Sequence, residues 1–298
     1  MSSTPGKDAV VRWVQETVAG TTPANPALKL FSKETLKCSL KLDIGQQESM
    51  DIGNVDVEDL FSVQNDYDIV VECHLCDVDR ILDFVDRAAN NTLNPYTLEY
   101  IPDVSAATKH YYRCTGWVLK ALDLKVGENA PWVATLTFEC GVIAAPVTVD
   151  PGIGIGSREA KSAIVDTIKH FASGAVTMDA AAWAILVGGL SVKFENDVGV
   201  KRTMGQKDPV NTLTQSATRR ISGSVDLSLD DGAKAQWDRV VAAAAHTIAI
   251  PFGGTGQQLL TLTGVSFPSI EVESNTDDDV LMGSQDFTAT GYTRGLVP

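Results

Sequence analysis

A short strand-like stretch occurs twice in the 298-residue sequence, and this repetition constrains the fold more than any other feature. LSVKFE, residues 190–195, matches CSLKLD, residues 38–43, which lies 152 positions earlier. In both stretches apolar residues alternate with Ser, Lys and an acid, as in a strand with one buried and one polar face. The sequence therefore predicts two equivalent, half-buried strands.

The rest of the sequence repeats in the same order. Three further pairs of segments align at offsets of 148 to 152: 69–87 with 221–239, 114–119 with 262–267, and 135–141 with 285–291. Self-similarity at a fixed offset is the mark of an internal repeat. We interpret it as a tandem duplication with two domains, residues 1–150 (the first half) and 151–298 (the second half), each near the usual domain size.

Helices are expected at two places in each half. Apolar spacing predicts a helix over 7–18 and a counterpart beginning at Ser157. A second helix follows Asp77, which is placed to cap it. Its counterpart in the second half, capped by Asp230 or Asp231, is expected to turn these residues inward: Ala233, Trp237, Val240, Val241 and Ala244.

A Thr-Gly pair recurs at 115–116 and 263–264, where the apolar alternation shifts by one residue. Such a shift predicts a β-bulge in both halves. The expected fold class is therefore mainly β with added helices. It consists of two tandem copies of a β-sandwich or half-barrel, each with one helix packed on a mostly antiparallel sheet.

The composition limits the function. The formal net charge of −14 argues against tight nucleic-acid binding, which needs clustered Lys and Arg. Neither a signal peptide nor an apolar run long enough to span a bilayer is recognisable, so we expect a soluble protein, cytoplasmic at synthesis. The five cysteines are an odd number in such a chain, which disfavours a disulfide framework.

No motif predicts catalysis, a metal or a cofactor. GIGIG, 152–156, has the wrong spacing for a dinucleotide fingerprint and is interpreted as a hinge between the halves. CHLC, 73–76, lacks a second ligand pair, and Cys73, like Cys38 and Cys114, aligns with an aliphatic residue of the other half. The acidic run 277–279 lacks the alternation of a calcium loop. The four histidines do not repeat between the halves, and we expect no enzymatic activity.

The polar face of the repeated strands does recur. It is either an ordinary wet sheet surface or the lining of a passage. The candidate lumen-facing residues are Lys41, Asp43, Glu72, His74, Lys193, Glu195, Ser224, Asp226 and Ser228.

A long polar segment follows the repeated strand in each half, 44–68 and 196–219. The first is acidic and the second basic, which suggests partner contacts; a solvated β-arm is the alternative. The candidate residues for contacts between subunits or rings are Gln47, Glu48, Asp51, Asp56, Glu58, Lys201, Arg202, Lys207, Arg219 and Arg220.

The order of these segments resembles the major tail tube protein of long-tailed, siphovirus-like bacterial or archaeal viruses. The second half carries the resemblance best, through LSVKFE, the basic loop, RRISGSVDLSLDDGAKAQWDRV, LLTLTGVSFPSIEVES and QDFTATGY. The resemblance implies inner sheets that join across a ring into a continuous β-barrel, with rings stacked into a tube through which DNA is ejected. Because this chain carries two copies, three chains are expected to form a pseudo-sixfold ring.

The same resemblance implies partners and a location. The partners are other copies of the chain, the tape measure, tail terminator and tail tip proteins, and DNA that passes without specific binding. The protein is expected in the virion tail, after assembly in the host cytoplasm. Two alternatives remain: an inner-tube subunit of a contractile tail or injection machine, and a tandem β-sandwich binding module with matched exposed aromatic residues.

Overall fold

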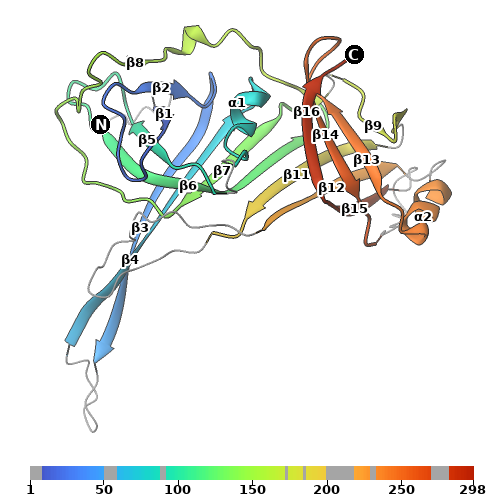
Figure 1. The fold of residues 1–298 in the computed structure, drawn as a ribbon, viewed down its shortest axis with the longest axis horizontal. Helices are drawn as coiled ribbons and strands as arrows, with labels where there is room; N and C mark the ends of the chain where they lie inside the picture. Colours follow the sequence, from blue (N-terminus) through green and yellow to red (C-terminus); the bar gives the residue numbers. More distant parts are fainter. Residues whose placement is uncertain are drawn as a thin grey trace.

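The computed structural model describes residues 9–49, 59–87, 92–171, 174–183, 186–198, 218–228, 233–269 and 282–298. Within these ranges the chain is mainly β, as predicted, with short helices beside the sheets (Figure 1). None of the helices in the described part is long and apolar enough to cross a bilayer.

The elements of the first half follow one another as β1 (Val10–Gln15), β2 (Ala27–Leu30), β3 (Thr35–Ser49), β4 (Asp59–His74), α1 (Val78–Leu82), β5 (Tyr96–Ile101), β6 (Tyr112–Gly127) and β7 (Val133–Glu139). Those of the second half are β8 (Ser157–Arg158), the 3-10 turn η1 (Lys161–Ala163), β9 (Thr177–Met178), β10 (Ala181–Ala182), β11 (Leu186–Asn196), β12 (Arg219–Ser228), α2 (Ala233–Ala242), β13 (His246–Pro251), β14 (Gln258–Val265), β15 (Met282–Ala289) and β16 (Gly291–Leu296).

Strand pairing follows the same scheme in both halves. β3 pairs with β4 and β4 with β7, just as β11 pairs with β12 and β12 with β15. β5 lies between β1 and β6, just as β13 lies between β9 and β14. The two hairpins and the strands that flank them therefore have matching neighbours.

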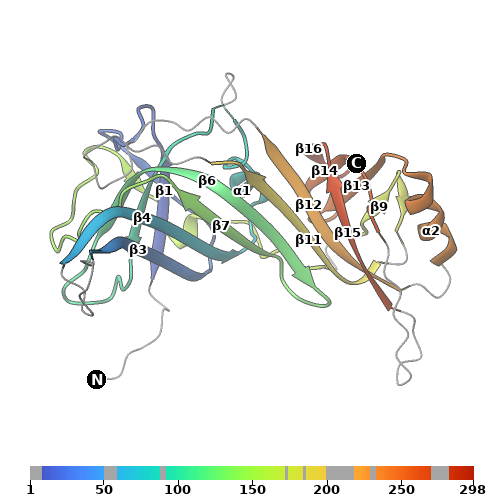
Figure 2. The ribbon, with the colours of Figure 1, turned by 90° about the horizontal axis from the view of Figure 1, so that it is seen from below.

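The two halves are joined through one sheet. β6 and β11 are antiparallel neighbours, paired from Gly127 with Gly189 to Ala121 with Glu195. The resulting sheet runs in the order β3-β4-β7-β6-β11-β12-β15, with β3 along one side (Figure 2). We call this the joined sheet.

One face of the joined sheet is buried. Apolar residues alternate along its strands, as in Leu122, Leu124 and Val126 of β6, and one apolar cluster includes residues from both halves. In the first half this cluster holds a group of aromatic rings in mutual contact, formed by Trp13, Phe31, Phe84, Tyr96 and Phe138. Burial of this face leaves the opposite, polar face exposed.

The predicted bulge is present in both halves. Between the pairs Tyr96–Trp117 and Leu98–Cys114, β6 has one residue more than β5, and Gly116 has φ 77°. Between His246–Val265 and Thr247–Thr263, β14 has the extra residue, and Gly264 has φ 60°. Glycine adopts this left-handed conformation without the strain that a Cβ causes.

The predicted helix over 7–18 is wrong. Residues 10–15 form β1, which is paired with β5 along its whole length. β-Branched valines pack well on a pleated surface, and long-range pairing overrides a helical spacing of three valines. The helix expected after Ser157 is also wrong: only the turn η1 is present, and Val165 is exposed.

The two later helices are present, but one faces differently from the prediction. Asp77 caps α1, and its Oδ1 accepts from the backbone N–H of Arg80 at 3.2 Å. In α2, Gln236 is buried and donates to Gln285, whereas Trp237 and Val241 are 54% and 71% exposed. The inward orientation predicted for those two residues is therefore wrong, as it is for Ala244, which is exposed and lies beyond the end of α2.

The Gly-rich segment 152–156 is held against the first half, so its interpretation as a hinge is wrong. The amide of Ile155 donates to Asn25 Oδ1 at 3.0 Å, and β8 pairs with β2. Arg158 then donates to Asp150 at 2.7 Å and to the fully buried carboxylate of Glu99 at 2.8 Å. These contacts make the connection between the halves an ordered strap.

Candidate assembly surface

The nine candidate lumen-facing residues all lie on the polar face of the joined sheet, in β3, β4, β11 and β12. Register supports this placement, since Lys193 is opposite both Asp123 and Ser222, and Ser191 is opposite Ser224. The Oγ atoms of Ser191 and Ser224 are 2.9 Å apart. Carboxylates outnumber basic groups on this face, which gives it a negative potential.

The repeated strands carry the same ion pair. Lys41 Nζ lies 3.3 Å from Asp43 Oδ2 in β3, and Lys193 Nζ lies 2.8 Å from Glu195 Oε1 in β11. Each pair joins residues two apart, which share a face of a strand. Such exposed pairs contribute little stability, about 0 to 1 kcal/mol, so they serve mainly to set the charge of the face.

The buried faces of these two strands differ. Leu190, Val192 and Phe194 of β11 are buried, Phe194 completely. At the matched positions of β3, Cys38 and Leu40 are only partly buried, and Leu42 is 50% exposed. β11 has neighbours on both sides, β6 and β12, whereas among the described residues β3 pairs only with β4. The outer edge of β3 is therefore open in the single chain.

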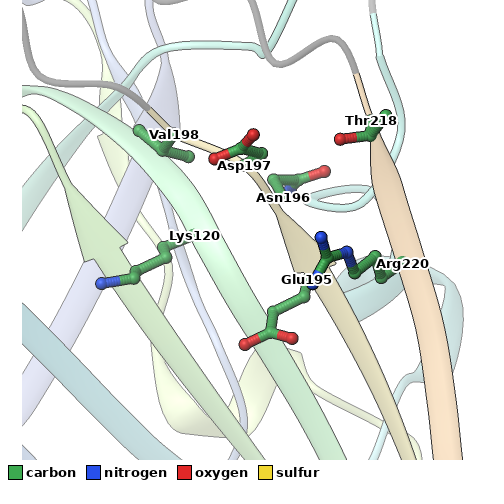
Figure 3. Close-up of a pocket in the computed structure, with 7 residues that line it drawn as sticks. All are labelled: Lys120, Glu195, Asn196, Asp197, Val198, Thr218 and Arg220. Carbon is green, nitrogen blue, oxygen red and sulfur yellow. The ribbon is translucent and has the colours of Figure 1, made fainter.

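A polar pocket of about 260 Å³ lies where the joined sheet meets the base of the second long segment (Figure 3). The side chain of Asn196 crosses between the halves here: it donates to the Leu119 carbonyl and accepts from Arg87, both at 2.9 Å. The hydrogen bond with Glu139 raises the pKa of Lys120. The pocket lining is Lys120, Glu195, Asn196, Asp197, Val198, Thr218 and Arg220.

A second pocket of about 330 Å³ lies at the matching place in the first half. Asp68 stands there at the position that aligns with Arg220, so the first pocket is more basic and this one more acidic. Its lining is Lys41, Asp43, Asp66, Tyr67, Asp68, Glu139 and Cys140. The opposite charge at matched positions continues the contrast between the two long segments.

The long segments are only partly described. β3 and β4 continue into the first one as a projecting hairpin arm that contains Gln47 and Glu48 (Figure 1). Arg219 and Arg220 begin β12, and Arg219 lies 4.7 Å from the ring centroid of Tyr292. The remaining candidates lie outside the described residues: Asp51, Asp56, Glu58, Lys201, Arg202 and Lys207, together with the acidic run 277–279.

The cysteines and His74 have surroundings that account for them as parts of the fold. All five cysteines are among the described residues, and none forms a disulfide. Burial raises the pKa of the Cys38 and Cys114 thiols to about 12, so both remain protonated near neutral pH. His74 pairs with Glu34 at 3.0 Å. Within the described ranges no three His, Cys, Asp or Glu side chains are placed to hold a metal ion.

The tryptophans do not form a binding platform. Trp13, Trp117, Trp132 and Trp183 are buried, and Trp237 alone is exposed. A tandem carbohydrate-binding sandwich would present aromatic rings at matched positions in both halves, and this arrangement is not found among the five tryptophans, all of which are described. Sequence reasoning missed the exposure of Trp237, which only the spatial surroundings of α2 show.

A joined, two-half sheet with a polar face, an open edge strand and a projecting arm defines a structural β-sheet subunit built for association. Comparison with protein-family models agrees: the model for phage tail tube proteins matches residues 6–290, and the chain belongs to this family. It is therefore a structural protein of the virion tail. A search of curated proteins found no match.

Proposed function

We propose that this protein polymerises as stacked rings into the tail tube and so forms the channel for DNA ejection. The observation that carries the proposal is the contrast between the matched strands β3 and β11. β11 is extended by β6 of the other half, while β3 has an open edge and an incompletely covered apolar face. An open, half-apolar edge favours strand addition by a second copy.

Head-to-tail strand addition explains how one chain supplies two units of a ring. Residues 1–150 and 151–298 act as duplicated tail-tube modules, joined internally by β6 and β11. Repeating that joint between copies places six modules in a ring of three chains, a pseudo-sixfold trimer, and the joined sheets close into a β-barrel. The two long segments, of opposite charge, contact neighbouring subunits or rings.

The polar face lines the channel in this arrangement. Its excess of carboxylates repels DNA phosphates, which limits adhesion during passage. Lys41 and Lys193 do not cancel this repulsion, because each is paired with a carboxylate on its own strand. The partners are further copies, the tape measure, tail terminator and tail tip proteins, and transiting DNA. The location is the virion tail, after assembly in the host cytoplasm.

The test uses the native chain and a single edge variant, Leu42→Lys. A lysine at this half-exposed position places a charge on the open edge and should block strand addition while the chain still folds. Val165→Lys, at a more exposed apolar residue that follows η1, is the matched control.

Negative-stain microscopy shows whether rings or tubes form, and light scattering gives the mass of the assembly, both over a concentration series. We expect rings or tubes and a mass of three chains for the native protein and the control, and monomers for Leu42→Lys. Assembly of Leu42→Lys at native concentrations contradicts the role of the β3 edge. A ring of six chains contradicts the trimer, and a native chain that forms no ring and joins no tail in a virion preparation contradicts the function.

A further inference from the structure

The halves meet at a second place, beyond the joined sheet. Helix α1 of the first half lies beside β14 and β16 of the second (Figure 1). Gln258 accepts from the amide of Val78 and donates to Asp77 Oδ1, both at 2.9 Å. Tyr292 Oη donates to Asp86 Oδ1 at 2.6 Å, and Arg294 donates to Asp83 Oδ1 at 2.9 Å.

The residues just after the helix also take part in this contact, since Arg219 donates to the Val85 carbonyl at 3.4 Å. Val85, which precedes Asp86, is fully buried. Burial, followed by the hydrogen bond to Asp86, raises the pKa of Tyr292 to about 12, so its hydroxyl remains a donor at neutral pH. Acids from the helix side therefore meet an Arg, a Tyr and a Gln from the sheet side.

Within the described ranges, the matching helix of the second half has no such cover. α2 follows β12 as α1 follows β4, and the Val85-Asp86-Arg87 sequence aligns with Trp237-Asp238-Arg239. Trp237 and Val241 are four residues apart, share one helix face, and are both more than half exposed. α2 lies at the side of the molecule that is remote from the first half (Figure 1).

The matching surface of the first half is also uncovered by any residue that the structure describes. Val142 and Val147 pair with Thr115 and Tyr111 beside the bulge of β6, just as β16 pairs with β14 beside its own bulge. This correspondence places Ile143 and Ala145 where the second half has Tyr292 and Arg294. The exposed segment 144–147, AAPV, is apolar, in contrast to its polar counterpart.

We propose that the Trp237 and Val241 face of α2 docks on segment 144–147 of a second copy, repeating between chains the contact that α1 makes within the chain. The proposal rests on the ring assembly proposed above. An exposed apolar helix face and an exposed apolar segment stand at the two positions that the internal contact predicts. Their burial against each other is favourable because it removes apolar surface from water. The acid and Arg pairs of the internal contact are thus replaced by an apolar contact between copies.

Cysteine cross-linking tests this contact. The full chain carrying Trp237→Cys and Ala145→Cys is oxidised under assembly conditions and resolved on a non-reducing gel. We expect a ladder of linked chains that dilution below the assembly concentration abolishes. The control pair, Val165→Cys with Ala145→Cys, and the native cysteines alone should give no ladder. A separate variant, Trp237→Lys, should raise the concentration needed for assembly by about tenfold.

The outcomes separate this contact from ring formation. Rings without cross-links above the control level overturn α2 docking and leave the tube subunit intact. Cross-links without rings support the docking and contradict the ring. The absence of both contradicts both. Cross-linking of the control pair to the same extent as the test pair overturns the specific contact.

Discussion

β3 and β11 are close copies in sequence, yet their surroundings differ. Both alternate apolar residues with Ser, Lys and an acid, and both carry a Lys–acid pair two residues apart. β11 is enclosed by β6 and β12, and its Phe194 is completely buried. Of the described strands only β4 lies beside β3, and Leu42 of β3 is half exposed.

The difference shows that two strands with the same sequence pattern can have different neighbours in the fold. In the proposed assembly a second copy supplies the strand that β3 lacks. An open edge strand with a half-exposed apolar residue tends to pair with other chains unless something covers the edge. The same contrast separates α1, which is covered by the second half, from α2, which is not. In both cases the uncovered copy lies where a second chain would continue the pattern.

Truncating the matched apolar residues of β11 and β3 should give the largest difference in stability between the two strands. Phe194→Ala removes a completely buried ring and should lower the free energy of unfolding of the monomer by about 3 to 5 kcal/mol. Leu42→Ala should lower it by less than about 1 kcal/mol, because the side chain is half exposed. Urea unfolding of unassembled chains measures both. Equal losses would show that β3 is already covered within the monomer.

Removing the buried carboxylate of Glu99 should have the next largest effect. This residue accepts from Arg113 at 2.6 Å and from Arg158 at 2.8 Å, and Pro251 stands at its aligned position, so the cluster is not repeated at the matching place. Glu99→Gln should cost about 3 kcal/mol, since it removes a fully buried charge that pairs with two largely buried guanidinium groups, of which only Arg158 keeps another carboxylate, Asp150.

The same variant should also release the strap around residues 151–158, which limited proteolysis would detect as faster cleavage. Lys120→Gln, which alters only a surface pair with Glu139, is the control and should leave cleavage unchanged. An unchanged cleavage rate in Glu99→Gln would mean that the strap is held by other contacts.

The two bulge glycines sharpen the comparison of the halves. Gly116→Ala and Gly264→Ala should each cost about 1 to 2 kcal/mol, because both sites have positive φ. Gly264→Ala should reach the upper end of this range, since its Cβ would overlap Thr290 Oγ1, which must move away. Thermal unfolding of the two variants compares them directly. A neutral effect at either site would argue against equivalent bulges.

The smallest effect concerns the pH dependence of the strap. Hydrogen bonds from Arg158 lower the pKa of Asp150 from 3.8 to about 2. A depressed folded-state pKa contributes stability above pH 3.8 that is lost as the pH falls toward 2. Because the side chain is nearly half exposed, the contribution is at most about 1 kcal/mol.

Asp150→Asn removes that contribution. Its stability deficit relative to the native chain should be constant above about pH 4 and shrink toward zero as the pH approaches 2. Denaturant unfolding across this range measures the deficit. A deficit that grows with acidity would contradict the assigned ion pair.

Much of the fold was predictable because local patterns persisted in the structure. Alternation located β3 and β11, the Thr-Gly phase shift located both bulges, and Asp77 marked the start of α1. Val10, Val11 and Val14 misled because their spacing suits a helix face, while pairing with β5 decided the outcome. Such pairing links residues some 85 positions apart and leaves no local signal.

The assembly surface was predictable only in part. Polar alternation correctly grouped the nine candidate residues on one sheet face. It could not separate the open strand from the enclosed one, because CSLKLD and LSVKFE carry the same pattern and only topology assigns their neighbours. The apolar stripe on α2 indicates that this helix face is suited to burial. It does not indicate whether the residues that bury it belong to the same chain. The Val-Asp-Arg and Trp-Asp-Arg match was the one available signal.

The central claim is that the outer edge of β3 receives a strand from a second copy, as β11 receives β6. A cryo-electron microscopy map of assembled tubes that resolves individual strands tests it most directly. We predict three chains per ring and a neighbouring chain's strand paired antiparallel along residues 38–43. Tubes in which that edge faces solvent, with copies joined elsewhere, would contradict the account.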